Sequence, residues 1–443
     1  MRTGAGAGAV GRGIAVLLVL LPLVLSKAVA QRPTPAPPQS KSILLKGGTV
    51  HVGNGTVIDD GAVGFRNGVI DFVGHSYGVK ATYDSILVTD GQHIYPGFIL
   101  PDNTLGLHEI DLVRATNDED ETGEMEPEVR AMSAFNVDSR IIPTVRSNGV
   151  LLVQSTPRGG VISGSSSILQ LDAWDHESAT VLAEDGVHLN WPRAYKREGW
   201  WAEPGESSAE QKDERGKRLD ALRQFFLKAR AYAQRVDQVE TDTRMEAMSG
   251  LFNGTRTLFV HADLAREIQE SVNFAHELGV ARTVIVGGYD AWRVADLLLD
   301  NKVDVILGRV HNLPLRDGDD IDLPYRLPTL LRSKGIRFCL GYAGDMERMG
   351  SRNLGFTAGT ASAYGLAKED ALQAITLDAA RILRIDAQYG SLAVGKSATL
   401  FTSAGDALDM RTCDVRQAYI DGRRIDLDDH QKKLYRQYLE RYR

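Results

Sequence analysis

The middle of this chain alternates short apolar runs with amphipathic stretches, and this alternation constrains the fold more than any other feature. The apolar runs are residues 149–153, 257–260, 283–286, 303–307 and 336–340. Helix-like stretches such as residues 264–278 lie between them. Strands that alternate with helices favour a parallel sheet with crossover helices. The pattern therefore predicts an α/β domain over residues 96–385.

The two ends of the mature chain differ from the middle, because both consist of short strand-like runs split by turns. In residues 42–95, apolar and polar positions alternate between turn signals such as Asn54-Gly55. The same alternation returns in residues 386–430. We expect these two parts to pair into one small β-sandwich domain, while the middle forms a (β/α)8 TIM-like barrel.

Two helical segments are added to this plan. Residues 206–248 are rich in charge but carry apolar residues at near-helical spacing, which indicates a helical insertion whose apolar stripe serves packing. Residues 431–443 are expected to form a C-terminal helix.

The first residues have the pattern of an export signal. Arg2 and Arg12 precede an apolar run at residues 14–25, and small residues follow at 28–30. This run is shorter than the roughly 20 apolar residues that a membrane span needs. We therefore expect a signal peptide at residues 1–30, a Pro-rich linker at 31–41, and a mature protein without a transmembrane segment. Its destination would be the periplasm or the extracellular space.

Charge and cysteine content exclude some classes of protein. The formal net charge of −7 argues against a nucleic-acid-binding surface. The chain has only Cys339 and Cys413, too few for a disulfide framework. One disulfide or two separate thiols both fit the sequence.

Three short motifs give the fold a family likeness. Residues 95–99 read YPGFI, residues 376–383 read TLDAARIL, and residues 390–400 read GSLAVGKSATL. In order and spacing they resemble the strand-one entry, the closing helix and the last β turn of the amidohydrolase superfamily, in its imidazolonepropionase-like branch. The resemblance extends over nearly all of the mature chain. It implies a barrel with a composite β domain, and a hydrolase acting on carbon–nitrogen bonds other than peptide bonds.

The resemblance also implies a metal site at the carboxyl ends of the barrel strands, but this chain departs from the pattern. The family has a His-x-His pair on strand one, where this chain has Asp102 and Thr104. His261 fills the position of the strand-five histidine. Glycines stand at the strand-six histidine, and Ala343 stands at the strand-eight aspartate. The metal site is therefore predicted to be degenerate.

Few candidates remain for metal binding and catalysis. His261 is the one clear metal-ligand position left, and Asp345, two residues beyond the expected aspartate, is a further catalytic candidate. A single histidine does not hold a catalytic ion, so zinc or another divalent metal is disfavoured. Asp102 is a candidate general base, because a carboxylate without a partner in a partly apolar barrel mouth would have a raised pKa.

A Gly/Ser-rich segment after residues 149–153 is a candidate ligand site. This segment combines a guanidinium with a loop that exposes backbone N–H groups, which favours an anionic or carboxylate ligand at Arg158, Gly159, Gly160 and Ser163. A tight structural loop would have the same composition.

Three functions fit these observations. The first is a carbon–nitrogen hydrolase with a rearranged or weakly metallated site. The second is a catalytically inactive barrel that binds a small molecule or a partner protein. The third is metal-free hydrolysis or isomerisation with Asp102 as the base. A small-molecule ligand is expected in each enzymatic case, and a homo-oligomer is left open.

Overall fold

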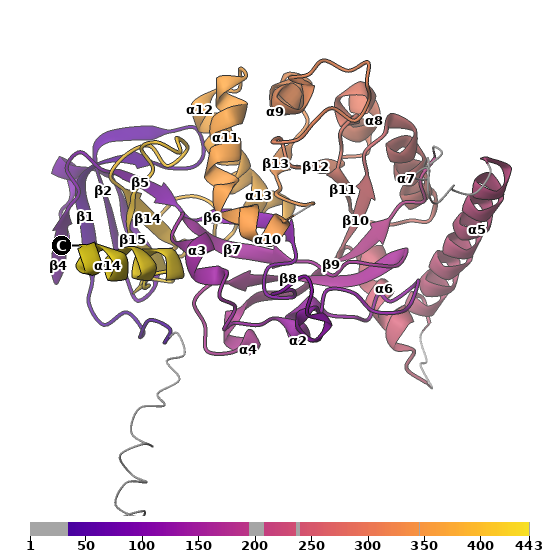
Figure 1. The fold of residues 1–443 in the computed structure, drawn as a ribbon, viewed down its shortest axis with the longest axis horizontal. Coiled ribbons are helices and arrows are strands. Elements are labelled where there is room, and N and C mark those ends of the chain that lie inside the picture. The colour runs from indigo at the N-terminus through magenta and orange to yellow at the C-terminus, as the bar shows by residue number, and fades with distance from the viewer. Residues whose placement is uncertain (1–33, 195–207, 236–239, 345, 443) are drawn as a thin grey trace, which may run out of the picture. The chain divides into compact units, whose positions relative to one another are not determined.

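The computed structural model describes residues 34–194, 208–235, 240–344 and 346–442 (Figure 1). The predicted signal peptide at residues 1–30 lies outside these described residues, as do residues 31–33 of the predicted linker.

The middle of the chain forms a nearly closed eight-stranded barrel. Its strands are β6 (Phe98–Asn103), β7 (Val150–Ser155), β8 (Ile162–Gln170), β9 (Thr180–Asn190), β10 (Thr257–Ala262), β11 (Thr283–Gly287), β12 (Asp304–Leu307) and β13 (Phe338–Leu340). They follow one another in chain order, and the two end strands β6 and β13 lie in contact. The prediction of a TIM-like barrel is confirmed, and all five apolar runs fall on strands.

One strand departs from a regular (β/α)8 barrel. β8 runs antiparallel to both neighbours, β7 and β9, while the other neighbouring pairs are parallel. The connection from β7 to β8 is residues 156–161, and a parallel return needs a crossover of a dozen or more residues. The chain therefore turns back at once, so that a hairpin replaces one strand–helix unit of the barrel.

β8 forms from a sequence that favours loops. Its residues, ISGSSSILQ, are all buried, and the serine hydroxyls find acceptors inside the barrel. Gly164 has a φ of 138°, and a Cβ there would lie 2.7 Å from the carbonyl oxygen of Val129. Small residues are thus required because another segment packs tightly against this strand.

Helices cover the outside of the barrel (Figure 1). They include α7 (Ala265–Glu277), α8 (Ala295–Asp300), α9 (Leu323–Ser333), α11 (Leu354–Ala363), α12 (Lys368–Ala374) and α13 (Leu377–Ile382). Where an insertion is predicted, α5 (Ser208–Ala233) and α6 (Thr243–Asn253) pack on each other. Leu222, Phe226 and Ala229 of α5 are buried at helical spacing, so the apolar stripe serves packing.

Strands from both ends of the chain join in a second sheet. Its strands are β1 (Ile43–His51), β2 (Val57–Arg66), β3 (Val69–His75), β4 (Ser85–Val88), β5 (His93–Pro96), β14 (Leu400–Ser403), β15 (Val415–Ile420) and β16 (Arg423–Arg424). The order is β16-β15-β14-β5-β1-β2-β3, with β4 paired to β1. In Figure 1 the indigo and yellow strands accordingly lie side by side. The predicted pairing of the two ends is confirmed.

Strand β1 connects two partners in this sheet. Its first half pairs with β4 and its second half with β5, and the register against β2 shifts on both sides of Gly48. Such irregularities bend a strand, which lets β1 pass from one partner to the next. β5 then leads directly into β6, so the sheet fixes where the barrel begins.

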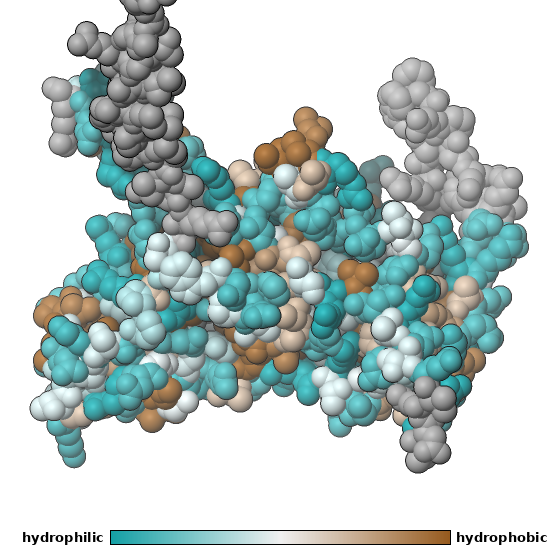
Figure 2. All heavy atoms as spheres, turned by 90° about the horizontal axis from the view of Figure 1, so that it is seen from below, coloured by the Kyte–Doolittle hydropathy of each residue, from teal (hydrophilic) through white to brown (hydrophobic). Residues whose placement is uncertain are grey.

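The structure also describes the two cysteines, the outer surface and the C-terminal helix. Cys339 is buried and Cys413 half-buried, and both are free thiols. Within the described residues, no helix combines the length and apolarity needed to cross a bilayer. Figure 2 shows one face of the molecule, on which apolar residues lie scattered among hydrophilic ones. The last helix, α14 (His430–Tyr442), ends the described chain.

Candidate functional site

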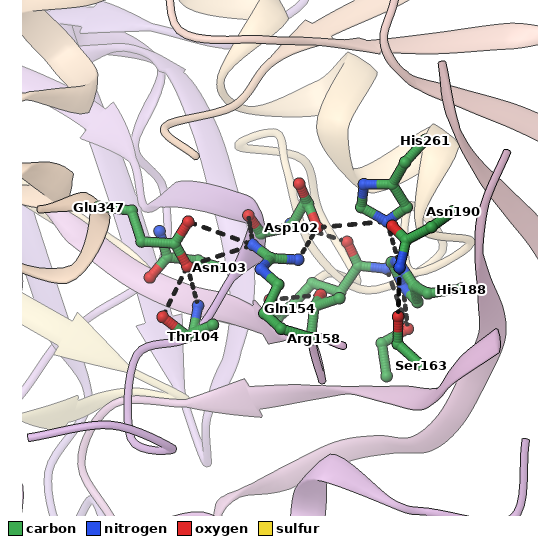
Figure 3. Close-up of polar contacts among 12 residues, drawn as sticks. Asp102, Asn103, Thr104, Gln154, Arg158, Ser163, His188, Asn190, His261 and Glu347 are labelled. Carbon is green, nitrogen blue, oxygen red and sulfur yellow. Dashed lines mark hydrogen bonds and ion pairs between the residues drawn. The ribbon is translucent and has the colours of Figure 1, made fainter. Parts of the chain in front are cut away.

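The carboxyl ends of the barrel strands bring together most of the predicted site residues (Figure 3). Asp102 lies near the end of β6 and is only 2% exposed. Its φ of 47° is unusual for a residue other than glycine. Two contacts hold this backbone: Gln154 Oε1 accepts from the Asp102 amide at 2.9 Å, and Arg158 Nη2 donates to the Asp102 carbonyl at 3.1 Å.

Arg158 reaches into the mouth from the β7–β8 turn and pairs with two carboxylates. Its Nη1 lies 2.6 Å from Asp102 Oδ1, and its Nη2 lies 3.2 Å from Oε1 of Glu347. Glu347 begins the short helix α10 (Glu347–Gly350). Glu347 Oε1 also accepts from the amide and the hydroxyl of Thr104, at 2.8 and 2.6 Å. One guanidinium therefore ties β6 to α10.

The pairing decides the charge of Asp102. Burial by itself raises the pKa of this carboxyl. The positive charge of Arg158 and the nearby histidines outweigh that effect, so the pKa falls below its ordinary value, to about 2. The prediction of a raised pKa was therefore wrong, because it assumed a carboxylate without a partner. At neutral pH Asp102 is an anion held by a cation, which makes it a weak base.

A pair of histidines lies beside this ion network. His261 lies near the end of β10 and His188 lies on β9, and His261 Nε2 is 2.9 Å from His188 Nδ1. His261 Nε2 is also 3.9 Å from Asp102 Oδ1. Burial lowers the pKa of both imidazoles, so both are neutral at pH 7.

The hydrogen bonds behind His188 assign the ring protons. The Ser166 hydroxyl lies 2.5 Å from a carboxylate oxygen of Asp185 and donates to it. Ser166 Oγ then accepts from His188 Nε2 at 2.8 Å, which leaves His188 Nδ1 as an acceptor for the Nε2 proton of His261. Among the described residues nothing bonds to His261 Nδ1. Its lone pair is therefore available to a ligand.

A cavity of about 520 Å³ opens over this end of the barrel. His261, Asp102, Gly159 and Gly160 line its floor, and its wall mixes apolar and charged side chains. The wall includes Trp191, Arg193, Asp263, Glu267, Tyr289, Arg309, Leu313 and Leu327. A small molecule with both polar and apolar parts fits such a lining.

The predicted Gly/Ser ligand site is held by the protein itself. The Asn190 amide donates to the carbonyls of Gly159 and Gly160 and to Ser163 Oγ, at 3.0–3.1 Å. The Arg158 amide donates to the Glu119 carbonyl. The carbonyls and the guanidinium are thus already bonded, while an anionic ligand here stays a prediction. Asp345, the other acidic candidate, lies outside the described residues.

His188 and Glu347 are site residues that the sequence analysis did not predict. The strands expected from the sequence did not include β9, which carries His188. The signal was present, since the alternation in VHLN at residues 187–190 places His188 and Asn190 on one face of a strand end.

Three side chains in the mouth are close enough together to be considered as ligands of a divalent metal. Asp102, His188 and His261 each offer one ligand atom, and these atoms lie within 4.8 Å of one another. The types suit zinc. However, the only anion among them already neutralises Arg158, whose fixed positive charge would lie beside the ion and repel it. As the side chains stand, this site does not fit a resident divalent ion.

Known proteins share this architecture. A model of the amidohydrolase family matches residues 325–425. An amidohydrolase from Thermotoga maritima MSB8 is similar to 87% of this chain and 99% of its own, at 25% identity and a TM-score of 0.75. An adenosine deaminase from Xanthomonas campestris with bound zinc covers 91% of this chain and 99% of its own, at 17% identity and a TM-score of 0.53. Molinate hydrolase covers 88% of this chain and 95% of its own, at 12% identity and a TM-score of 0.55. No curated protein matches the sequence.

Proposed function

We propose that the chain is a member of the amidohydrolase superfamily and that it hydrolyses a carbon–nitrogen bond, other than a peptide bond, of a small molecule in the barrel mouth. The observation that carries this proposal is the position of His261. It lines the cavity, its Nε2 is bonded to His188, and its Nδ1 faces no protein partner among the described residues.

His261 acts as the general base in this proposal. Its pKa is lowered by burial, so the imidazole is neutral at pH 7 and ready to take a proton. The bonds from Asp185 through Ser166 and His188 hold it in one tautomer, as an orienting group does for a catalytic base. Asp102 stays ionised nearby and stabilises the imidazolium that forms.

The reaction balances without a further reactant. A water molecule gives a proton to His261 Nδ1 while its oxygen bonds to the substrate carbonyl carbon. The carbon–nitrogen bond then breaks, and the leaving nitrogen takes the proton from His261. Acid and amine are the products, and the histidine returns to its starting state. The imidazolonepropionase-like branch belongs to the same proposal and would make a cyclic amide the substrate class to try first.

The test is a turnover screen on the full chain after dialysis against a chelator. Small cyclic amides, N-acyl amino acids and ureas serve as substrates, and release of amine or ammonia is measured. We expect turnover of one class, with a loss of about 10²–10⁴-fold in His261→Asn. His75→Asn, far from the mouth on β3, is the matched control and keeps the rate. Turnover that vanishes on chelation and returns with zinc would contradict the proposal.

A ligand-binding barrel without turnover is the second candidate. The observation that favours it is the ion network, because Arg158 directs its N–H groups at Asp102 and Glu347 rather than at the cavity. The guanidinium N–H groups are then not directed at a substrate, and they cannot polarise its carbonyl group. Ligands from the same panel that raise the melting temperature but give no product would identify this function.

A further inference from the structure

Arg158 stands where the mouth of the barrel concentrates its ligand atoms. Its Nη1 binds Asp102 Oδ1, and that same oxygen lies 3.9 Å from His261 Nε2. His188 Nδ1 is the third ligand atom of the group. The guanidinium thus binds the one anionic atom that a metal at this place would also need.

Two carboxylates surround the guanidinium of Arg158, as anionic ligands surround a bound cation. Asp102 and Glu347 are 2% and 7% exposed, and each makes a close contact with the guanidinium. His188 Nδ1 and His261 Nε2 lie 2.9 Å apart beside these two carboxylates. Without Arg158, two buried carboxylates would remain beside two imidazole nitrogens. That combination favours a divalent ion.

The arginine is fixed in this place. Its amide donates to the Glu119 carbonyl, and residue 120 pairs with it in a short parallel bridge. Its guanidinium donates to Asp102 Oδ1, to the Asp102 carbonyl and to Glu347 Oε1. Contacts at both the backbone and the side chain therefore hold the residue in the mouth.

We infer that Arg158 is a built-in cation that takes the place of a metal ion in this barrel and keeps divalent ions out of a latent Asp102–His188–His261 site. The inference is independent of the proposed hydrolase activity, because it concerns which cation occupies the mouth and not what the mouth does to a substrate.

The experiment removes the guanidinium and measures metal. Full-length protein and Arg158→Ala are stripped with chelator, incubated with Zn²⁺ or Co²⁺, and analysed for bound metal. We expect the variant to retain about one ion per chain, with an affinity on the order of a hundredfold above that of the parent protein. The Co²⁺ form should show absorption bands of nitrogen and oxygen ligation, and these bands should disappear in Arg158→Ala/His261→Ala.

Two further variants keep the test decisive. Arg158→Lys retains a positive charge and should bind no more metal than the parent. Arg158→Ala/Glu347→Gln lacks the guanidinium but leaves fewer buried charges without a partner, so it serves if the single variant does not fold. In either metal-binding variant, zinc should raise the melting temperature, while the parent shows no shift.

The inference is overturned by either of two results. The first is a parent protein that takes up about one tightly bound ion per chain after chelator treatment and loses it in Asp102→Asn. The second is a folded guanidinium-free variant that binds no more metal than the parent. Neither result depends on finding a substrate, so failure here is distinguishable from failure of the hydrolase proposal.

Discussion

Among the described residues, two pairs of histidines lie in hydrogen-bond contact, each with one buried and one half-buried ring, and one of the two pairs lies at a candidate active site. His188 and His261 meet at 2.9 Å in the barrel mouth, and His51 and His93 meet at 3.0 Å in the second sheet. Each pair has a carboxylate partner nearby. In residue type and in nitrogen–nitrogen distance the two pairs are nearly the same.

They differ in what their ring nitrogens face. His51 has Glu369 on Nδ1 at 2.8 Å and His93 on Nε2, and its ring stacks on Tyr95 at 4.4 Å. Every polar atom of that ring is used inside the fold. In both pairs the second ring, His93 or His261, has one nitrogen without a bonded partner among the described residues, but His261 lines the cavity of the barrel mouth. A close pair of histidines is therefore not enough to mark a candidate active site, whereas a position at a cavity makes His261 a candidate base.

The largest expected effect falls on turnover in the mouth. His261→Asn removes the base and should lower kcat by about 10²–10⁴-fold. His51→Asn should leave kcat unchanged, because that ring contacts no part of the cavity. Steady-state rates with a substrate found in the screen measure both. Equal losses in the two variants would break the distinction between the pairs.

The next effect concerns the ion network rather than the histidines. Arg158→Met leaves Asp102 and Glu347 buried without their cation, which should cost about 3–5 kcal/mol of unfolding free energy. Lys368→Met breaks the half-exposed pair with Asp406 near the other histidines and should cost about 1 kcal/mol or less. Urea unfolding of both variants gives the ratio. A similar loss of unfolding free energy in the two variants would mean that the ion pairs of the mouth contribute no more to stability than a half-exposed pair.

Substitutions in the pair of His51 and His93 should lower the unfolding free energy and leave kcat unchanged. His51→Ala removes two hydrogen bonds and leaves Glu369 without its partner, at a cost of about 1–3 kcal/mol. Urea unfolding measures this loss, and the melting temperature of the mouth variant His261→Asn should change less. A larger loss of stability in His261→Asn than in His51→Ala would reverse the roles assigned here.

The smallest effect is the pH dependence of the mouth. Since the pKa of His261 lies below its ordinary 6.5, kcat should be flat above about pH 6.5 and fall as the imidazole gains a proton below it. The unfolding free energy should also depend on pH, through groups that oppose one another. His188 and His261, both with a lowered pKa, contribute less stability as pH falls below 6.5. Asp185, whose pKa burial raises to about 6, gains stability as pH falls from 6 toward 3.8.

The net slope follows from these opposing contributions. We expect it to be smaller than the roughly 1.4 kcal/mol per pH unit that one unopposed group gives. Chemical unfolding between pH 5 and 7 measures it, and Asp185→Asn should make the slope steeper. A slope unaffected by that substitution would remove Asp185 from the network.

Much of the fold could be predicted because its signals are local. The apolar runs of the barrel strands, the turns of the second sheet and the motif at residues 95–99 lie in short windows of sequence. β8 could not be found this way, since its glycine and serines favour turns. Only packing against both neighbouring strands turns that segment into a strand.

The site was predictable in part. Asp102 and His261 were found because they occupy positions that a familiar pattern defines. The contact of Arg158 with Glu347 joins residues 189 positions apart, and no local signal announces it. Because Arg158 also contacts Asp102, the pKa of Asp102 is shifted down and not up as the sequence analysis expected. The chemistry of a carboxylate depends on its partner, and the partner is set by the tertiary fold.

The antiparallel course of β8 makes the electrostatics of the mouth a property of a single turn. Arg158 lies in residues 156–161, between two strands that both belong to the barrel wall. We expect a change in the length of this turn to move the guanidinium away from Asp102 and Glu347, because these partners come from other elements of the fold. A protein engineer could therefore exchange an internal cation for an external one by editing a hairpin, without redesigning the barrel.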